Sequence, residues 1–434
     1  MRLVKCFGAA CLFLCLDAAW ADISEPWGLH SQFTLVDQFH PSFPAAYSGR
    51  NSLNPASANN ETTDITLYAG MRVSTNGEIW INPEIDQGFG LSDTVGMAGF
   101  PSGEAYKVGA NAPYQRLPRL FYRKTISLGG QSEQVESGEN QLAGSVTSDN
   151  LVLTLGKFSV VDVFDTNAYA HDPRMDFMNW SVIESGAFDY AADAWGYTYG
   201  SSIEWTKSWW TVRGGIFDMS KTPNSTKLDP TFAQHEWVGE FEERHQILGH
   251  PGKLKLLGFV NVARMGSYAD ALRLARQTHA IPDTSLVSRG NSNSGMALNV
   301  EQEISPDLGG FLRASYSDGA EQAYDFTEID RSVSAGVSMK GNRWGRSGDT
   351  LGLAAAVNEL SGAARNYFAA GGMGILIGDG GLNYGPERIM ESYYELRTSD
   401  HVYITFDYQY AVNPAYNRDR GPLNIYGMRL HLEY

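Results

Sequence analysis

The stretch that decides the fold is Tyr-Gly-Met-Arg-Leu-His-Leu-Glu-Tyr at 426–434. Successive side chains of a β-strand point to opposite faces, so the tyrosines, the methionine and the leucines share one face. Glycine, arginine, histidine and glutamate take the other face. The same alternation recurs along the chain, and no helical segment is left to cover so many apolar faces. An apolar-out, polar-in strand ending in an aromatic residue is typical of a transmembrane β-barrel.

Period-two alternation of apolar and polar residues predicts about sixteen strands. The fold class expected is therefore all-β, a transmembrane antiparallel barrel whose short turns face the periplasm and whose long loops face outward, some of them folded into the lumen to constrict it. The predicted strands are 29–37, 63–73, 78–86, 117–128, 150–158, 196–206, 209–218, 234–244, 253–263, 295–304, 310–317, 331–340, 350–358, 389–396, 402–412 and 424–434.

The connections between these strands alternate in length, which supports the barrel. Tight turns such as Ser-Thr-Asn-Gly at 74–77 alternate with long segments, and Asn-Gly is a strong hairpin signal. Short turns on one rim and long loops on the other are the asymmetry of outer-membrane barrels, and a soluble β-sandwich would not require it. The segment 129–149 is an exception, because it is long and polar where a short turn is expected.

The amino terminus predicts export. Arg2 and Lys5 precede an apolar core at 6–16, and an Ala-Trp-Ala cleavage site follows. We expect a signal peptide over 1–21 and a single barrel domain over 22–434, located in the outer membrane of a Gram-negative bacterium. All three cysteines of the chain lie in the signal peptide, so the mature protein has no disulfide or thiolate site.

Composition narrows the partners. The formal net charge of −16 argues against nucleic acid as a partner. No apolar run reaches the roughly 18 residues that a transmembrane helix needs, whereas 46 Gly, 22 Tyr, 20 Phe and 10 Trp favour strands and turns. Outer-membrane lipid is therefore the expected surroundings of the barrel. General porins are often trimers, which leaves a homo-oligomer open.

The predicted lumen carries charges of both signs, and a barrel of this strand number is wide enough for a water channel. The segment 159–195 is too apolar for a solvated loop, so we expect it to fold inside and narrow the channel. Its rings (Phe164, Tyr169, Phe177, Trp180) either stack on sugars or only anchor the loop. The candidate pore-lining residues are Arg72, Trp80, Glu84, Asp86, Arg116, Arg119 and Arg123 from the strands and Asp162, Asp165, Asn167, Asp172 and Arg174 from the loop.

The basic candidates allow two interpretations. If Arg119 and Arg123 confront Glu84 and Asp86 of the preceding strand, the lumen holds a transverse field in which polar solutes must orient. Alternatively, the arginines pair with loop carboxylates only to hold the fold.

Six motifs are spread over nearly the whole mature chain. They begin with Phe-Pro-Ala-Ala-Tyr-Ser-Gly-Arg-Asn-Ser-Leu at 43–53 and continue at 80–92, 99–109, 156–167, 188–197 and 412–422. In these motifs the chain resembles the carbohydrate-selective porins of the OprB type. The resemblance implies a sixteen-stranded outer-membrane barrel that passes monosaccharides by diffusion. It also implies an eyelet shaped by 99–109 and 160–180, with charged residues at the constriction, which adds Glu104 to the candidates.

Other functions find little support in the sequence. The chain has no G-x-S-x-G motif of a serine hydrolase. Glu84 and Asp86 share a strand face and could mimic the paired carboxylates of a glycosidase, but inward-facing acids are ordinary in a wet lumen. Asp162, Asp165 and Asn167 lack the glycine and terminal glutamate of a calcium loop, and the nine histidines show no metal-ligand spacing. We therefore expect no enzyme activity, no metal and no cofactor. A general, unselective porin is the main alternative to a sugar porin.

Overall fold

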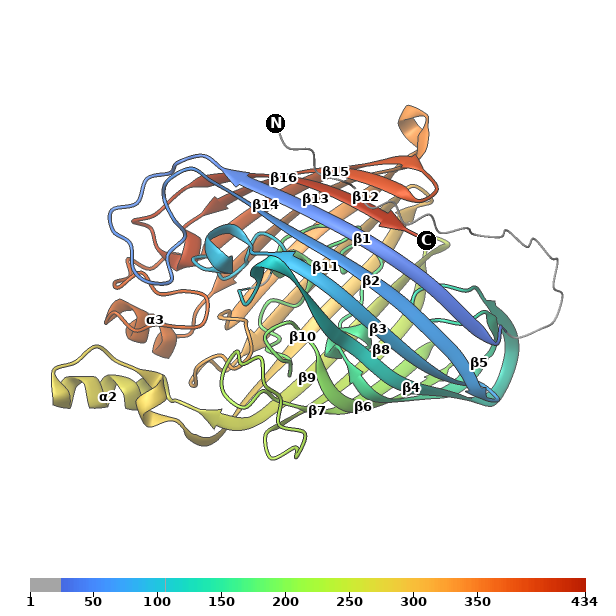
Figure 1. Cartoon of the computed structure of the whole chain (residues 1–434), viewed down its shortest axis with the longest axis horizontal. Coiled ribbons are helices and arrows are strands. Elements are labelled where there is room, and N and C mark those ends of the chain that lie inside the picture. Colours follow the sequence, from blue (N-terminus) through green and yellow to red (C-terminus); the bar gives the residue numbers. More distant parts are fainter. Residues whose placement is uncertain (1–24, 106) are drawn as a thin grey trace, which may run out of the picture.

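The computed structural model describes residues 25–105 and 107–434, which form a closed barrel of sixteen antiparallel strands (Figure 1). Each strand pairs with its neighbours in sequence, and β1 closes the barrel against β16. The predicted signal peptide lies outside the described residues. The strands are β1 Trp27–His40, β2 Ala58–Ser74, β3 Gly77–Gly88, β4 Ala110–Val135, β5 Gly144–Phe158, β6 Thr198–Lys207, β7 Trp210–Asp218, β8 His235–Ile247, β9 His250–Met265, β10 Arg289–Ser305, β11 Leu308–Ser317, β12 Arg331–Gly341, β13 Arg346–Glu359, β14 Glu387–Ser399, β15 Val402–Val412 and β16 Leu423–Glu433.

All sixteen predicted strands are confirmed, and the largest difference is at 129–149. That segment was predicted as a long polar connection, but most of it is strand, because β4 continues to Val135 and β5 begins at Gly144. The alternation fades there because both faces of these strand ends are polar. Only 136–143 connects the two strands.

The two faces of the barrel differ as the alternation predicts. On β16, Tyr426 is 50% exposed on the outer face, whereas Arg429 is fully buried on the inner face. The outer face of the other strands likewise exposes large apolar side chains such as Ile65, Leu155 and Phe406. In a membrane this apolar face would contact lipid. The closed barrel suits a membrane because the backbone groups of each strand are bonded to neighbouring strands and no sheet edge is left.

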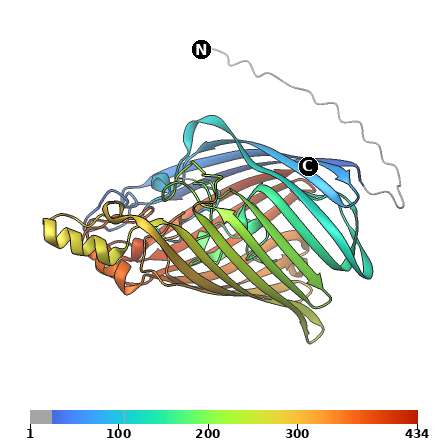
Figure 2. The same ribbon diagram turned by 90° about the horizontal axis from the view of Figure 1, so that it is seen from below.

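The two ends of the barrel also differ (Figures 1 and 2). Connections of two to four residues join β2 to β3, β6 to β7, β8 to β9, β10 to β11, β12 to β13 and β14 to β15 at one end, where the chain also terminates. The opposite end carries the long loops and the helices α2 Tyr268–Thr278 and α3 Gly362–Ala369. No helix within the described ranges is both long and apolar enough to cross a membrane. The remaining helical turns are α1 Trp180–Ile183, η1 Leu91–Thr94, η2 Val160–Asp162, η3 Thr284–Val287, η4 Asn342–Trp344 and η5 Pro414–Tyr416.

Candidate functional site

The connection between β5 and β6, residues 159–197, lies inside the barrel and is called the lumen loop below. Its backbone N–H groups donate to carboxylates of inward-facing strand residues. These bonds take the place of the hydrogen bonds to water that a buried backbone loses. Because the carboxylates come from β8, β10 and β14, the loop runs across the lumen. The acceptor and donor residues are Glu240 with Asp165 (2.9 Å), Glu301 with Ala168 (2.8 Å), Glu391 with Asn179 (3.1 Å) and Glu236 with Ala191 (2.9 Å).

The rings of the lumen loop divide between anchoring and lining. Phe164 and Phe177 are fully buried. Phe177 meets Tyr393 of the wall edge to face, with 4.9 Å between ring centroids. Anchoring therefore accounts for these two rings, and burial of each contributes about 1.5–3 kcal/mol. Trp180 instead borders a cavity, although one face of its indole already stacks on Phe100.

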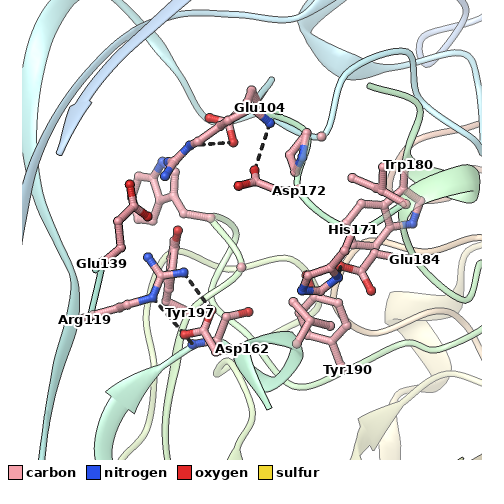
Figure 3. A pocket seen from close by; sticks show the side chains of 18 of the residues that line it. Glu104, Arg119, Glu139, Asp162, His171, Asp172, Trp180, Glu184, Tyr190 and Tyr197 are labelled. Atoms are coloured by element: carbon pink, nitrogen blue, oxygen red, sulfur yellow. Dashed lines mark hydrogen bonds and ion pairs between the residues drawn. The ribbon is translucent and has the colours of Figure 1, made fainter. Parts of the chain in front are cut away.

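A cavity of about 230 Å³ lies between the lumen loop, the strands β2 and β4, the segment 99–109 and the connection from β4 to β5 (Figure 3). It is smaller than the roughly 300–1,000 Å³ of pockets for drug-sized ligands, so it suits one small solute. Its charged lining consists of Glu104, Arg119, Glu139, Asp162, His171, Asp172, Arg174 and Glu184. Its aromatic lining consists of Tyr68, Trp180, Tyr190, Trp195 and Tyr197.

Arg174 of the lumen loop links three parts of the protein at this cavity. Its guanidinium lies 3.0 Å from Glu104 of the segment 99–109. It also lies 3.4 Å from Asp64 of β2 and 3.5 Å from Glu84 of β3, and it donates to the Tyr68 hydroxyl. The side chain is almost fully buried, so the guanidinium balances carboxylates that have little access to water.

The segment 99–109 joins the lumen loop through the backbone as well. Gly103 donates its N–H to the carbonyl of Met178, and Trp180 donates to the carbonyl of Phe100. The two loops named by the family resemblance therefore meet at the cavity.

Arg119 forms the opposite corner of the cavity with the first turn of the lumen loop. Its guanidinium makes two hydrogen bonds to Asp162, of 2.7 and 2.8 Å, and lies over the ring of Tyr197 at 5.0 Å. The same residues appear together in Figure 3. This bidentate pair fits the interpretation that an arginine of the wall holds a loop carboxylate.

Arg116 is the arginine that meets the acids of the preceding strand. It pairs with Glu84 and Asp86 side by side on the wall, because β4 is adjacent to β3 and places Arg116 opposite Glu84 in register. The guanidinium also lies over Trp195. The hypothesis that Arg119 and Arg123 confront Glu84 and Asp86 is wrong, because these two arginines pair with Asp162 and Glu78 instead.

The remaining candidates lie outside the cavity. Arg72, Trp80 and Arg123 gather around Glu78 toward the short-turn end, where Arg123 lies 3.0 Å and Arg72 lies 3.8 Å from its carboxylate. Asp165 and Asn167 instead fix the lumen loop to Asn299 of β10, with distances of 2.7 Å for both hydrogen bonds. Glu104, Arg119, Asp162, Asp172 and Arg174 are the sequence-predicted residues that the structure brings together.

Several lining residues were not among the predicted sites. Tyr68 stands on the inward face of a predicted strand, so its position was readable from the alternation. Tyr190 and Tyr197 lie in a family motif at 188–197. Glu139 lies in the anomalous stretch 129–149, whose length was its only signal. For Glu184 we find no sequence signal.

Two sides of the cavity differ in charge. His171 Nδ1 lies 3.7 Å from the Glu184 carboxylate. Burial, aided by the Arg313 guanidinium, lowers the pKa of His171, and burial raises the pKa of Glu184 well above its usual range. Both groups are therefore biased toward their neutral forms, whereas the Arg119–Asp162 side is an ion pair.

Glu328 gives a pH-dependent prediction. Its buried carboxylate accepts N–H groups of Ile375, Leu376 and Ile377 at 2.6–2.9 Å, yet burial raises its pKa to about 7. A raised pKa contributes stability at low pH that is lost as pH rises through about 7. Hydrogen-exchange protection of these amides, corrected for intrinsic rates, should be higher at pH 5 than at pH 8. In Glu328→Gln the pH dependence should disappear; an unchanged dependence would contradict the assignment.

The described ranges hold no group of three His, Cys, Asp or Glu residues that could bind a metal ion. The three residues that suggested a calcium loop are separated by their partners, because Asp162 turns to Arg119 while Asp165 and Asn167 turn to Asn299.

The chain is similar to known channel proteins. Residues 50–434 match the family model described as carbohydrate-selective porin, OprB family. The structure of Pseudomonas putida OprB at high pH has 14% sequence identity and a TM-score of 0.72, and the match covers 94% of each chain. The outer membrane channel DcaP of Acinetobacter baumannii has 10% identity and a TM-score of 0.52, covering 94% of this chain and 97% of that one. At these identities the two structures show the fold alone. No curated protein sequence matches the chain.

Proposed function

Because the chain belongs to the OprB family of carbohydrate-selective porins, we propose that it passes monosaccharides by passive diffusion through a lumen narrowed by the lumen loop. The family and the barrel make it an outer-membrane channel, and the resemblance seen in the sequence motifs is confirmed. Monosaccharides as the solutes, the narrowing and the cleavage of residues 1–21 belong to the proposal.

The observation that carries the proposal is the make-up of the cavity lining. Its two arginines are already held by carboxylates, so a neutral solute need not break an ion pair to enter. Tyrosine and tryptophan rings stand beside these polar groups. Sugars have C–H faces that pack on rings and hydroxyls that bond to planar polar groups, which is the combination present here.

Sugar block of single channels tests the function. Adding a monosaccharide to a planar bilayer containing the purified protein should lower the ion current in proportion to occupancy of the cavity. Polyethylene glycol of equal hydrodynamic radius is the control, and it should lower the current less. Equal effects of the two solutes would favour the general, unselective porin.

The orientation of the barrel can be tested by cysteine substitution, because the only native cysteines lie within residues 1–21. Leu286, which is 69% exposed, and Arg418 lie on the long loops, whereas Thr75 lies on a short turn. On intact cells, a membrane-impermeant thiol reagent should label Leu286→Cys and Arg418→Cys but not Thr75→Cys, since short turns face the periplasm in such barrels. Labelling of Thr75→Cys alone would show that the barrel has the opposite orientation.

A further inference from the structure

The turn between β4 and β5 differs from the other turns at its end of the barrel. The strands it joins are 26 and 15 residues long and carry polar extensions at 129–135 and 144–149. Its eight residues, 136–143, compare with two to four in the other connections of that end. In Figure 1 this hairpin, drawn in teal, curves over the end of the barrel.

The turn is fixed against the inside of the barrel rather than left in solvent. Leu142 is 2% exposed and packs where Gly28 leaves room, since a Cβ on Gly28 would lie 2.9 Å from its side chain. The Ala143 N–H donates to the Glu25 carboxylate at 2.7 Å. The Arg72 guanidinium donates to the Ala143 carbonyl at 3.2 Å.

A further contact holds the turn at Asn140. Arg123 of β4 donates to the Asn140 carbonyl, and its guanidinium also pairs with Glu78 of β3 at 3.0 Å. Arg72 and Arg123 were predicted to line a pore. In the structure both hold this turn in place, which gives their inward positions a role.

The middle of the turn borders the cavity described above. Glu139 and Asn140 line it together with His171, Asp172 and Arg174 of the lumen loop. Figure 3 shows Glu139 beside Arg119, on the side of the cavity opposite His171 and Glu184. Burial raises the pKa of Glu139, and the Arg174 and Arg119 guanidinium groups oppose that effect. Glu139 is nevertheless an exposed residue, and it borders the cavity where a solute would lie.

We propose that the β4–β5 turn forms the periplasmic wall of the solute site and that Glu139 is a specificity-determining residue for sugars with vicinal hydroxyls. A carboxylate has two oxygens and accepts only, so it can bond two neighbouring hydroxyls of one ring. The inference rests on the proposed function of the channel.

The test compares two neutralising variants of the same turn. Glu139→Gln keeps the shape of the side chain and removes the charge, while Glu136→Gln makes the same change at an exposed position that does not line the cavity. Block by glucose is measured in planar bilayers, together with 2-deoxyglucose, which lacks one of the vicinal hydroxyls.

Glu139→Gln should weaken glucose block roughly fivefold, the loss expected when one charge-assisted hydrogen bond becomes a neutral one. It should also reduce the preference for glucose over 2-deoxyglucose, and Glu136→Gln should match the wild type in both respects. Equal glucose block in wild type, Glu139→Gln and Glu136→Gln would overturn the inference. Absence of sugar block in the wild type would instead overturn the proposed function.

Access from one side gives a second, independent measurement. In Glu139→Cys, a charged methanethiosulfonate reagent added to the short-turn side of the bilayer should lower the current, because the cysteine borders the conducting path. Modification without any change of current would show that the turn stands outside that path, and would contradict its role as a wall of the site.

Discussion

Replacing residues 168–178 of the lumen loop by a short glycine–serine linker should leave an assembled barrel with severalfold larger conductance and no discrimination between sugars and other solutes of equal size. The strand ladder closes without the loop, so the wall does not depend on these residues. The replaced stretch carries His171, Asp172 and Arg174, which form one side of the cavity, so its removal opens the cavity and, on the proposed function, widens the channel.

A deletion of equal length provides the control for this experiment. Helix α2 also has 11 residues, lies at the long-loop end and does not line the cavity. Its removal should leave conductance and sugar block close to those of the wild type. If the lumen-loop variant keeps the conductance and sugar uptake of the intact protein, the loop is not the gate, and the segment 99–109 becomes the better candidate.

Arg174→Ala is expected to make the channel strongly cation-selective and to destabilise the loops around the cavity. The substitution leaves the carboxylates of Asp64, Glu84 and Glu104 without the guanidinium that lies 3.0–3.5 Å from them. Removing one partner of a buried ion pair costs about 3–5 kcal/mol. The uncompensated negative charge also attracts cations into the lumen.

Reversal potentials in a salt gradient measure the first effect of Arg174→Ala, and hydrogen exchange of the lumen loop measures the second. Arg343→Ala, which removes the same charge from an exposed turn, should change neither. A wild-type reversal potential in Arg174→Ala would show that the ions avoid this cavity.

The barrel could be predicted from the sequence because a strand between lipid and water must alternate its side chains. That physical requirement marks every strand where it crosses the membrane. It lapses at 129–135 and 144–149, where both faces of the hairpin are polar, so these residues looked like a loop. The turn that carries Glu139 was hidden for the same reason.

The site was predictable by residue type but not by pairing. Alternation places Arg119 and Arg123 on the lumen side, and Arg116 joins them only through the register shift between β3 and β4. Each of the three finds different partners: Arg116 pairs with Glu84 and Asp86, Arg119 with Asp162 and Arg123 with Glu78. These choices depend on the register between β3 and β4, which is broken by irregularities, and on the path of the loop. Neither is encoded in local periodicity. The separation of Asp162 from Asp165 and Asn167 has the same origin.

The way the wall holds the lumen loop bears on how such channels change over time. Glu236, Glu240, Glu301 and Glu391 accept main-chain N–H groups, and every residue except proline supplies one. The anchors therefore do not read the identity of the residues they hold. Mutations in the loop can alter the chemistry offered to a solute while the path of the chain stays the same. The same barrel can thus acquire new solute preferences by mutation in the loop, without any intervening variant that fails to fold.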